Sequence, residues 1–317
     1  MSLRGKVLFI TGASRGIGKA IAVRAGRDGA SVAIVAKTTE ANKRLEGTIF
    51  SAAAEVEQAG GRAVGIQCDI RSEEQVQRAM DQTVRAFGGV DIVVNNASAI
   101  HLAGTAETEV KRFDLMHSVN GRGAWVVAKA ALEHLQRAAN PHILNISPPL
   151  GHLQRTASRK INSGSLTAAA AEDTWFARAP AYAMAKFGMS LCVLGLAGEL
   201  QAQSIAVNAL WPLTLIETAA LRIADADGAG KRRARRAEIM ADAAHHILTQ
   251  PAATFTGRFC LDELLLRRSG VTDFAQYNAT PGTRLEDLSL DFFLDAAQLD
   301  ELAALRRQQK EEQGTVP

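Results

Sequence analysis

The feature that most constrains this chain is a strand, a glycine turn and a helix that follow one another near its start. An apolar run rich in β-formers over 7–10 is typical of a buried parallel strand. Gly12, Gly16 and Gly18 follow, and apolar residues then recur at helical spacing. Gly12 permits a tight turn, Gly16 lets the backbone approach a pyrophosphate, and the helix N-terminus offers free N–H groups to the anion. The stretch therefore predicts a dinucleotide site.

Strand-like and helix-like segments alternate along most of the remaining chain. Apolar runs typical of strands cover 32–36, 63–66, 91–94, 142–146, 205–210 and 256–261, and helical patterns cover 49–58, 72–87, 113–139, 181–201 and 238–248. The links are short and carry no hairpin signals, which favours parallel strands joined by helices. The predicted fold class is therefore α/β, a doubly wound parallel sheet of the Rossmann type in a single domain.

Composition and charge argue against several classes of binding partner. Apolar residues make up 47% and charged residues 22% of the chain, and the net charge of +3 is too small to indicate a nucleic acid or a membrane. The three cysteines are scattered, which argues against a zinc spacing or a disulfide framework and favours a reducing compartment. The longest uncharged apolar stretch, near 188–198, is shorter than the ~18–20 residues of a membrane span. We expect a cytoplasmic protein that holds no metal and spans no membrane.

The end of the second strand is where a dinucleotide site distinguishes between its two common cofactors. Sites that prefer NAD place an acid there for the adenosine ribose. This chain has Lys37 and Thr38 instead, and Arg15 adds a second cation in the glycine turn. Two cations suit a 2′-phosphate, so the sequence favours NADP (NADPH). Two alternatives stay open, because Glu40 lies nearby and because both cations could be plain surface charges.

The strongest catalytic signal is Tyr182 followed four residues later by Lys186. Positions four apart share one face of a helix, so the two side chains can act together. A tyrosine ordinarily titrates near ~10 and is a poor base at neutral pH. A nearby ammonium and an oxidised nicotinamide would favour the phenolate and lower that pKa. Tyr182 could then exchange a proton with a substrate oxygen while hydride moves to or from the cofactor.

Three motifs together resemble the short-chain dehydrogenase/reductase family. They are Thr11-Gly12-Ala13-Ser14-Arg15-Gly16-Ile17-Gly18, Asn95-Asn96-Ala97-Ser98 (with serine where the family has glycine) and Tyr182-Ala-Met-Ala-Lys186. The resemblance implies an enzyme that interconverts an alcohol and a ketone or aldehyde. In it Tyr182 is the proton donor or acceptor, Lys186 also binds the ribose, and Asn120 holds a relay water. The implied cofactor contacts are Gly12, Ser14, Arg15, Gly16, Ile17, Gly18, Lys37, Asp69, Asn96, Ala97, Tyr182, Lys186, Pro212, Ile216 and Thr218.

The serine that this family keeps after its fifth strand is displaced here. Aligned on the strand, its position falls on Pro148, and Ser147 stands one residue earlier. A proline has no hydroxyl to offer a substrate oxygen. Either Ser147 acts as a catalytic residue from a shifted position, or the relay consists of Tyr182, Lys186 and Asn120 without it.

Further segments resemble one branch of the family, the hydroxysteroid dehydrogenase-like protein 2 proteins. They include Ile-Ser-Pro-Pro-Leu at 146–150, Ile-Ala-Val-Asn-Ala-Leu-Trp-Pro at 205–212 and Asp-Phe-Phe-Leu-Asp at 291–295. The resemblance implies one dehydrogenase domain over 1–295, with an unusual insertion at about 152–173 and a substrate lid at about 213–236. A charged C-terminal helix or tail is expected at 296–317, and a sterol-carrier domain is not expected.

The sequence also predicts partners for the chain and an alternative to an enzymatic function. The resemblance implies a homo-oligomer, a dimer or tetramer, formed through the long helices at 113–139 and 181–201. An apolar pocket walled in part by Trp175 and Phe176 would suit a lipid-like carbonyl or alcohol substrate. The basic run 231–236 is expected to be a solvated helix face, with a phosphate-bearing ligand or an acidic partner as the alternative. Because the serine is displaced, a cofactor-binding sensor or scaffold with little redox turnover is the alternative to an enzyme.

Overall fold

One parallel sheet organises the protein. The structure is a computed structural model that describes residues 2–41, 46–151, 174–224, 229–294 and 296–314. Seven strands pair in the order β3-β2-β1-β4-β5-β6-β7, all parallel. They are β1 (Val7–Thr11), β2 (Ser31–Ala36), β3 (Arg62–Gln67), β4 (Ile92–Asn95), β5 (His142–Ile146), β6 (Ala206–Trp211) and β7 (Phe259–Leu261). The order reverses between β1 and β4, which places the switch point of the doubly wound sheet beside the glycine turn. The predicted α/β Rossmann-type fold is confirmed.

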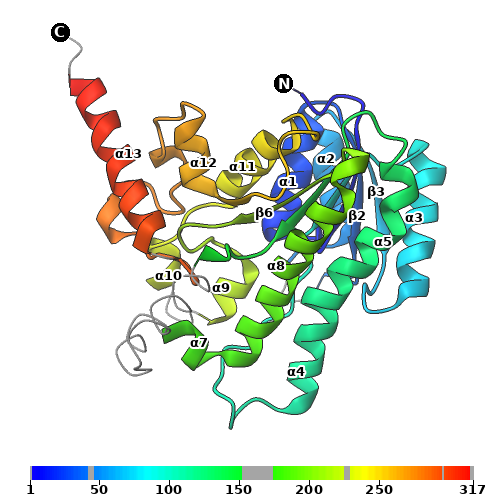
Figure 1. Ribbon diagram of the computed structural model, residues 1–317, viewed down its shortest axis with the longest axis horizontal. Coiled ribbons are helices and arrows are strands. Elements are labelled where there is room, and N and C mark those ends of the chain that lie inside the picture. The colour runs from blue at the N-terminus through cyan, green and yellow to red at the C-terminus, as the bar shows by residue number, and fades with distance from the viewer. Residues whose placement is uncertain (1, 42–45, 152–173, 225–228, 295, 315–317) are drawn as a thin grey trace.

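Helices cover both faces of this sheet (Figure 1). They are α1 (Gly16–Arg27), α2 (Ile49–Gln58), α3 (Glu73–Phe87), α4 (Val110–His117), α5 (Ala124–Leu135), α7 (Thr174–Arg178), α8 (Pro180–Leu200), α9 (Ala219–Ala224), α10 (Ala229–Arg232), α11 (Glu238–Leu248), α12 (Asp262–Arg268) and α13 (Ala296–Gly314). A π-helix, η1 (Ser118–Gly123), joins α4 to α5, and short 3₁₀ turns form η2 (Gln201–Gln203), η3 (Ala275–Tyr277) and η4 (Leu285–Asp287).

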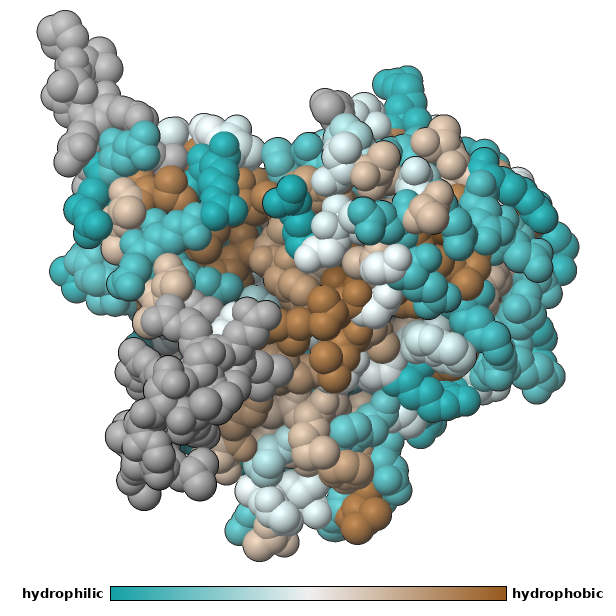
Figure 2. Space-filling model, viewed as in Figure 1, coloured by the Kyte–Doolittle hydropathy of each residue, from teal (hydrophilic) through white to brown (hydrophobic). Residues whose placement is uncertain are grey.

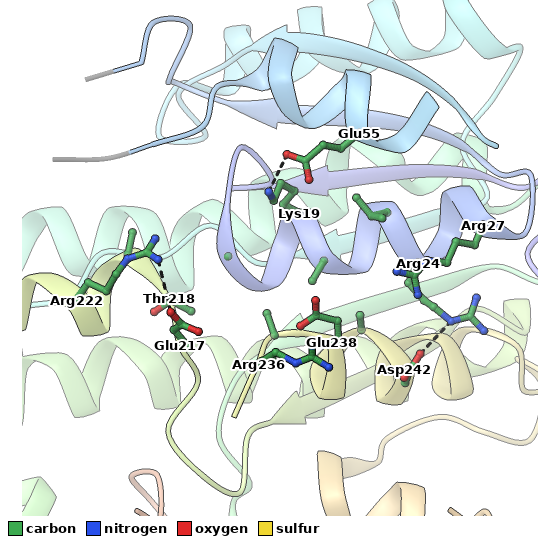
Figure 3. A pocket seen from close by; sticks show the side chains of 16 residues that line it. Lys19, Arg24, Arg27, Glu55, Glu217, Thr218, Arg222, Arg236, Glu238 and Asp242 are labelled. Atoms are coloured by element: carbon green, nitrogen blue, oxygen red, sulfur yellow. Dashed lines mark hydrogen bonds and ion pairs between the residues drawn. The ribbon is translucent and has the colours of Figure 1, made fainter. Parts of the chain in front are cut away.

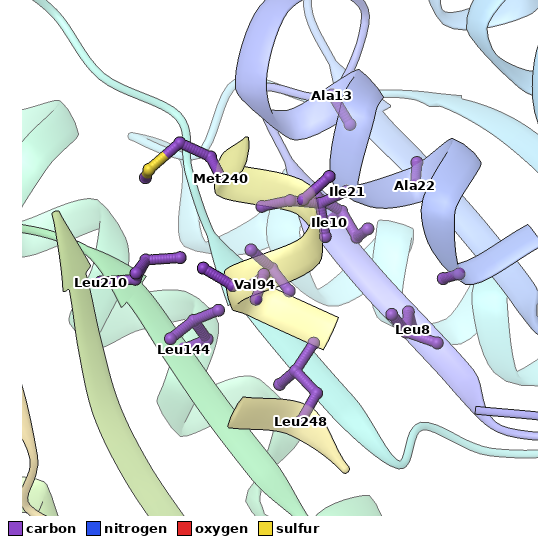
Figure 4. Packing of buried hydrophobic residues seen from close by; sticks show 14 of the residues in the cluster. Leu8, Ile10, Ala13, Ile21, Ala22, Val94, Leu144, Leu210, Met240 and Leu248 are labelled. Atoms are coloured by element: carbon purple, nitrogen blue, oxygen red, sulfur yellow. The ribbon is translucent and has the colours of Figure 1, made fainter. Parts of the chain in front are cut away.

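The strands divide the core in two because successive side chains point to opposite faces of a sheet. Leu8 and Ile10 of β1 pack with α1, α2 and α11 in one hydrophobic cluster. Figure 4 shows side chains of this cluster lying close together. Phe9, between them, packs with α3, α5 and α8 on the other face. Burial on both faces explains why β1 is an unbroken apolar run. It also fixes the carboxyl ends of the central strands at one edge, where the site lies.

The C-terminal extension is anchored through a buried ion-pair network. Arg306 of α13 and Arg267 of α12 both pair with Glu263, which is fully buried. Arg235 pairs with the same carboxylate and is only 1% exposed. The prediction that the basic run is a solvated helix face is therefore wrong at Arg235, because a buried acid from a distant element draws that side chain inward.

Helix α8 is long and apolar, and much of it is buried inside the fold. Among the described residues it is the one helix that by length and composition could cross a membrane. Of its most apolar window, however, 61% is buried inside the fold, where it packs against β6 and η1. Core helices of folded domains pass the same test of length and composition, so the test is weak evidence for a span.

Candidate active site

The glycine turn is locked by the residues that end β4. Gly12 has a φ of +64°, and a Cβ added to it would lie 2.7 Å from Ala97 Cα. The Asn96 amide donates to Thr11 O and Gly12 O, each at 3.0 Å, and it also leaves no room for a Cβ on Gly18. The sequence placed these residues at the cofactor site, and the structure brings them together.

The start of α1 is suited to an anion. No side chain caps it, and no acidic residue lies in its first turn. The backbone N–H groups there therefore face outward with the positive end of the helix dipole. Gly16 lies beside Thr218, whose methyl group would be 3.5 Å from an added Cβ. Thr218, from the segment after β6, thus borders the glycine turn, and the uncapped start of α1 fits the diphosphate of a dinucleotide.

The ends of β2 and β3 form a charged corner. Arg15 donates from Nε and Nη2 to the carbonyls of Glu46 and Gly47, at 2.9 and 2.7 Å, so it bridges the glycine turn to the loop after β2. Lys37 is 61% exposed and its ammonium lies 3.8 Å from Asp69 Oδ2. Asp69 is held chiefly by Arg71, whose hydrogen bonds are the main reason that its pKa lies below the usual value.

Tyr182 and Lys186 lie near the start of α8 and are 5% and 3% exposed. The Lys186 ammonium donates to Ile146 O at 2.9 Å and lies 5.3 Å from the centre of the Trp211 ring. Burial raises the pKa of Tyr182 and lowers the pKa of Lys186 to about 8. The expected lowering of the Tyr182 pKa is therefore not found within the protein alone, because burial deprives the phenolate of water and disfavours it.

Asn120 lies in the π-helix η1, inside the segment 113–139 that the sequence predicted to be mostly helical. It is fully buried, and its amide exchanges two hydrogen bonds with Ala99, Nδ2 donating to the carbonyl at 3.0 Å and Oδ1 accepting from N–H at 2.8 Å. The wider turn packs against α8. A π-turn breaks the 3.6-residue period, and such turns occur frequently at functional sites. The prediction that 113–139 is mostly helical is confirmed, and the structure adds a π-turn in its middle.

Ser147 directly follows β5 and is fully buried. Its hydroxyl has no hydrogen-bond partner among the described residues, which is rare for a buried polar atom. Pro148 O accepts a hydrogen bond from the Ser190 hydroxyl at 2.6 Å, which fixes this proline against α8. The predicted insertion at 152–173 and the side chain of Trp175 lie outside the described residues.

The segment after β6 contains three residues that the sequence predicts to contact the cofactor, Pro212, Ile216 and Thr218. Ile216 forms an isolated bridge with Arg235, and Pro212 and Thr214 are buried beside it. The Thr214 hydroxyl is a second buried polar atom without a partner in the described chain. Sequence reasoning named Pro212, Ile216 and Thr218 here and missed Thr214, because burial of its hydroxyl has no signature in the sequence.

An aromatic cluster surrounds Tyr182. Phe293 stacks on the Tyr182 ring with centroids 6.3 Å apart, and it lies 6.1 Å from Trp211. Phe176 stacks on Phe187 at 5.1 Å and approaches Phe293 at 5.6 Å. Phe176 was predicted in the substrate wall. Phe293 was missed, because nothing in the local pattern shows that a residue so far along the chain returns to α8.

A cleft of about 320 Å³ opens beside the glycine turn, between α1, α11 and the start of α9 (Figure 3). Its charges are largely paired with one another, Lys19 with Glu55 at 2.8 Å and Arg24 with Asp242 at 3.0 Å. Tyr182 is not part of its lining, so this cleft is not the place of the reaction. No group of histidine, cysteine and acidic residues in the described chain is arranged to hold a metal ion.

Comparison with known proteins identifies the class that this site defines. The family model of short chain dehydrogenases matches residues 6–161. The chain belongs to the short-chain dehydrogenase/reductase family, and it is an NAD(P)-dependent enzyme of that family.

Among its relatives are proteins named hydroxysteroid dehydrogenase-like protein 2. That of Danio rerio is 48% identical over 92% of this chain and 65% of its own length, and that of Bos taurus is 45% identical over 99% and 68%. The chain thus spans about two thirds of these relatives. A solved Xanthomonas campestris protein is 50% identical with a TM-score of 0.82, covering 93% of this chain and all of its own. A short-chain dehydrogenase from Mycobacterium thermoresistibile is 44% identical with a TM-score of 0.80, covering 93% and 96%.

Proposed function

We propose that the protein is an NADP(H)-dependent oxidoreductase that interconverts an alcohol and a ketone or aldehyde. The observation that carries the cofactor choice is the charge at the end of β2. Lys37 stands there, largely exposed, where an acid would bind the ribose of NAD. Arg15 reaches toward the same corner from the glycine turn. A 2′-phosphate would meet two cations there, and charge-assisted hydrogen bonds to such a group are among the strong ones.

The residues that would hold the cofactor follow from this geometry. The start of α1 would take the diphosphate, Asp69 the adenosine end, and Ile216 and Thr218 the carboxamide side. Lys186 keeps ammonium hydrogens beyond the one given to Ile146 O, so it can also bind a ribose hydroxyl. When bound, the nicotinamide supplies or accepts the hydride.

The protein itself handles the proton. Because burial raises its pKa, Tyr182 keeps its phenolic proton at neutral pH and is suited to donate it to a carbonyl oxygen. In the opposite direction a charged Lys186 favours the phenolate, so that Tyr182 can accept a proton from an alcohol. Ser147 has a hydroxyl in position at the end of β5, and its lack of a partner in the described chain supports a role toward the substrate oxygen.

The substrate class proposed is an apolar, lipid-like carbonyl or alcohol. The wall of Phe176, Phe187 and Phe293 around Tyr182 supports it, since aromatic side chains provide large apolar area. With NADPH and a series of straight-chain ketones, we expect kcat/KM to rise roughly fourfold for each added methylene, the equivalent of ~0.8 kcal/mol. A flat series would exclude an extended apolar site.

We also propose that the protein is a homo-oligomer that associates through α5 and α8. The outward face of α8 carries Met184, Leu191 and Leu194, each 56% exposed, and neighbouring Trp125 of α5 is 47% exposed. Figure 2 shows hydrophobic side chains gathered over α8. Exposed apolar patches of this kind mark protein interfaces. By analytical ultracentrifugation, Leu191→Arg should give smaller particles, whereas Phe50→Arg on α2 should not. Identical masses would refute this interface.

A cytoplasmic location is part of the proposal. It is supported by three free cysteines, of which Cys68 is buried, since disulfides are rare in a reducing compartment. Fractionation of cells that express the full-length natural protein would test it.

Nucleotide titration tests the central proposal. Calorimetry should show tighter binding of NADPH than of NADH. Lys37→Ala and Arg15→Ala should each weaken NADPH about tenfold, worth ~1.4 kcal/mol, and leave NADH unchanged. Lys111→Ala, an exposed lysine of α4, is the matched control and should change neither. Tighter NADH would overturn the NADP(H) assignment and direct attention to Glu40. If neither nucleotide bound, the nicotinamide-dependent reaction itself would be refuted.

A further inference from the structure

The C-terminal strap, residues 289–294, runs beside the segment that follows β6. Leu215 N donates to Ser289 O at 2.9 Å. Two residues further along the strap, Asp291 N donates to Leu213 O at 3.0 Å. These two hydrogen bonds flank an isolated antiparallel bridge. Because β6 ends at the carboxyl edge of the sheet, the strap is fixed at the edge where the site lies.

Phe293 has an unusual backbone conformation within this strap. Its φ is +65°, in the left-handed region that a bulky L-residue rarely adopts. The other non-glycine residue with a positive φ in the described chain is Ser204, a small residue in an exposed turn. The Trp211 indole donates to Phe292 O at 2.9 Å, so it fixes the peptide group that precedes Phe293. Strained conformations of this kind persist only where the surroundings determine them, and they cluster at functional sites.

The side chain of Phe293 packs among aromatic rings near the start of α8. It is 3% exposed, and its ring centre lies 5.2 Å from that of Phe187 and 6.1 Å from that of Trp211. The centre of the Tyr182 ring lies 6.3 Å away, and the two planes are inclined by 30°. Aromatic pairs at such separations attract one another beyond the apolar area that they bury. Phe293 is the one ring in the described chain that stacks on Tyr182.

The orientation of the Tyr182 ring depends on this packing. Its hydroxyl has no hydrogen-bond partner among the described residues. The hydroxyl of Tyr277, in contrast, is directed by a hydrogen bond that it donates to Asp242 Oδ2 at 2.8 Å. Proton transfer requires the Tyr182 hydroxyl to lie within hydrogen-bond reach of a substrate oxygen. A displacement of about 1 Å in such a geometry can lower a rate about a hundredfold.

We propose that Phe293 is a positioning residue of the reaction, whose ring fixes the direction in which Tyr182 presents its hydroxyl to the substrate. This inference rests on the proposed function and deepens it. Lys186 belongs to the same arrangement, since its ammonium lies 5.3 Å from the centre of the Trp211 ring that also contacts Phe293. The C-terminal strap thus helps to build the catalytic pair from a distant part of the chain.

Fluorine NMR of the full-length chain tests whether Phe293 holds the ring. The chain has only two tyrosines, so incorporated fluorotyrosine gives two signals, and Tyr277→Phe assigns them. In Phe293→Leu the Tyr182 signal should narrow, because leucine cannot stack on the ring and the ring gains motion. The Tyr277 signal should keep its line width, since its hydrogen bond to Asp242 is untouched.

Phe274→Leu is the matched control for loss of a buried ring. Phe274 is 6% exposed and lies 6.0 Å from Tyr277, and it makes no ring contact with Tyr182 within the described chain. Because the Tyr277 hydrogen bond remains, neither signal should narrow in this variant. With NADPH and phenanthrenequinone, kcat should fall about tenfold to a hundredfold in Phe293→Leu and stay unchanged in Phe274→Leu. Calorimetry should show equal NADPH affinity in both.

The outcomes separate this inference from the proposed function. An unchanged Tyr182 line width in Phe293→Leu, or equal narrowing in Phe274→Leu, would overturn the role of Phe293. Narrowing without a fall in kcat would also overturn it, because the freedom of the ring would then not affect the reaction. If Phe293→Leu does not fold, Phe293→Met removes the ring with a smaller loss of volume and serves for the same comparison. Narrowing in a chain whose wild type reduces no carbonyl with NADPH or NADH would support the hold of Phe293 on Tyr182 and refute the proposed function.

Discussion

Gly12→Ala tests how the phosphate turn is built. Gly12 has a φ of +64°, and an added Cβ would lie 2.7 Å from Ala97 Cα and 2.9 Å from Ala97 N. Gly16 provides a matched control, because its φ of +58° is similar but its added Cβ would lie 3.5 Å from the Thr218 methyl, an ordinary contact. An alanine in the left-handed region costs about 1–2 kcal/mol at either position. Only at position 12 does overlap with a backbone add to this.

We therefore expect Gly12→Ala to lower the free energy of unfolding by about 2–5 kcal/mol, the sum of left-handed strain and overpacking. Gly16→Ala should lower it by only about 1–2 kcal/mol. Urea unfolding followed by circular dichroism measures both changes. Equal losses would refute the reasoning, because they would mean that Ala97 gives way at no cost. Calorimetric binding of NADPH provides a second reading, since the Asn96 hydrogen bonds to the turn depend on the same close approach.

Three further predictions concern catalysis, the ion-pair network and pH. Tyr182→Phe should keep its affinity for NADPH by calorimetry while carbonyl reduction falls ~10²–10⁴-fold; loss of nucleotide binding instead would contradict its role. Glu263→Gln should lower the free energy of unfolding in urea by about 3–5 kcal/mol, because three arginines lose a buried partner. The more exposed Glu301→Gln should cost at most about 1 kcal/mol, and similar losses would show that burial is not the cause. Burial lowers the pKa of His142 to about 4. The unfolded chain therefore takes up this proton first, and stability should fall by up to about 3 kcal/mol as pH drops from about 6.5 toward 4. Thermal melts across that range should show a smaller fall for His142→Asn, and an unchanged fall would exclude this histidine as the source.

The sheet could be predicted from sequence because parallel strands buried on both faces leave unbroken apolar runs. Both termini of the helix predicted from Ser72 carry local signals, a serine whose side chain accepts from Gln75 N and a left-handed Gly88 after the last turn. Signals of this kind act over one turn of chain and do not require the rest of the fold. The predicted and observed bounds therefore agree closely in these segments.

The π-helix and the buried arginine could not be predicted in the same way. Asn120 departs from the helical period because Ala99, on a separate loop, binds its side chain. Arg235 sits in a run that looks solvated, but Glu263 fixes it in the interior. In both cases the deciding partner is distant in sequence, and its position depends on packing that no local pattern encodes.

The sequence by itself determined the doubly wound sheet, the glycine turn and the spacing of Tyr182 and Lys186, since each rests on local periodicity or on residue types a few positions apart. Only the tertiary structure decided the electrostatic surroundings of that pair. Burial raises the pKa of Tyr182, and the charge of Asp291, more than 100 positions later in the chain, adds to that increase. The physical reason is that charge and desolvation act through space, so the groups that set them become neighbours only when the chain has folded.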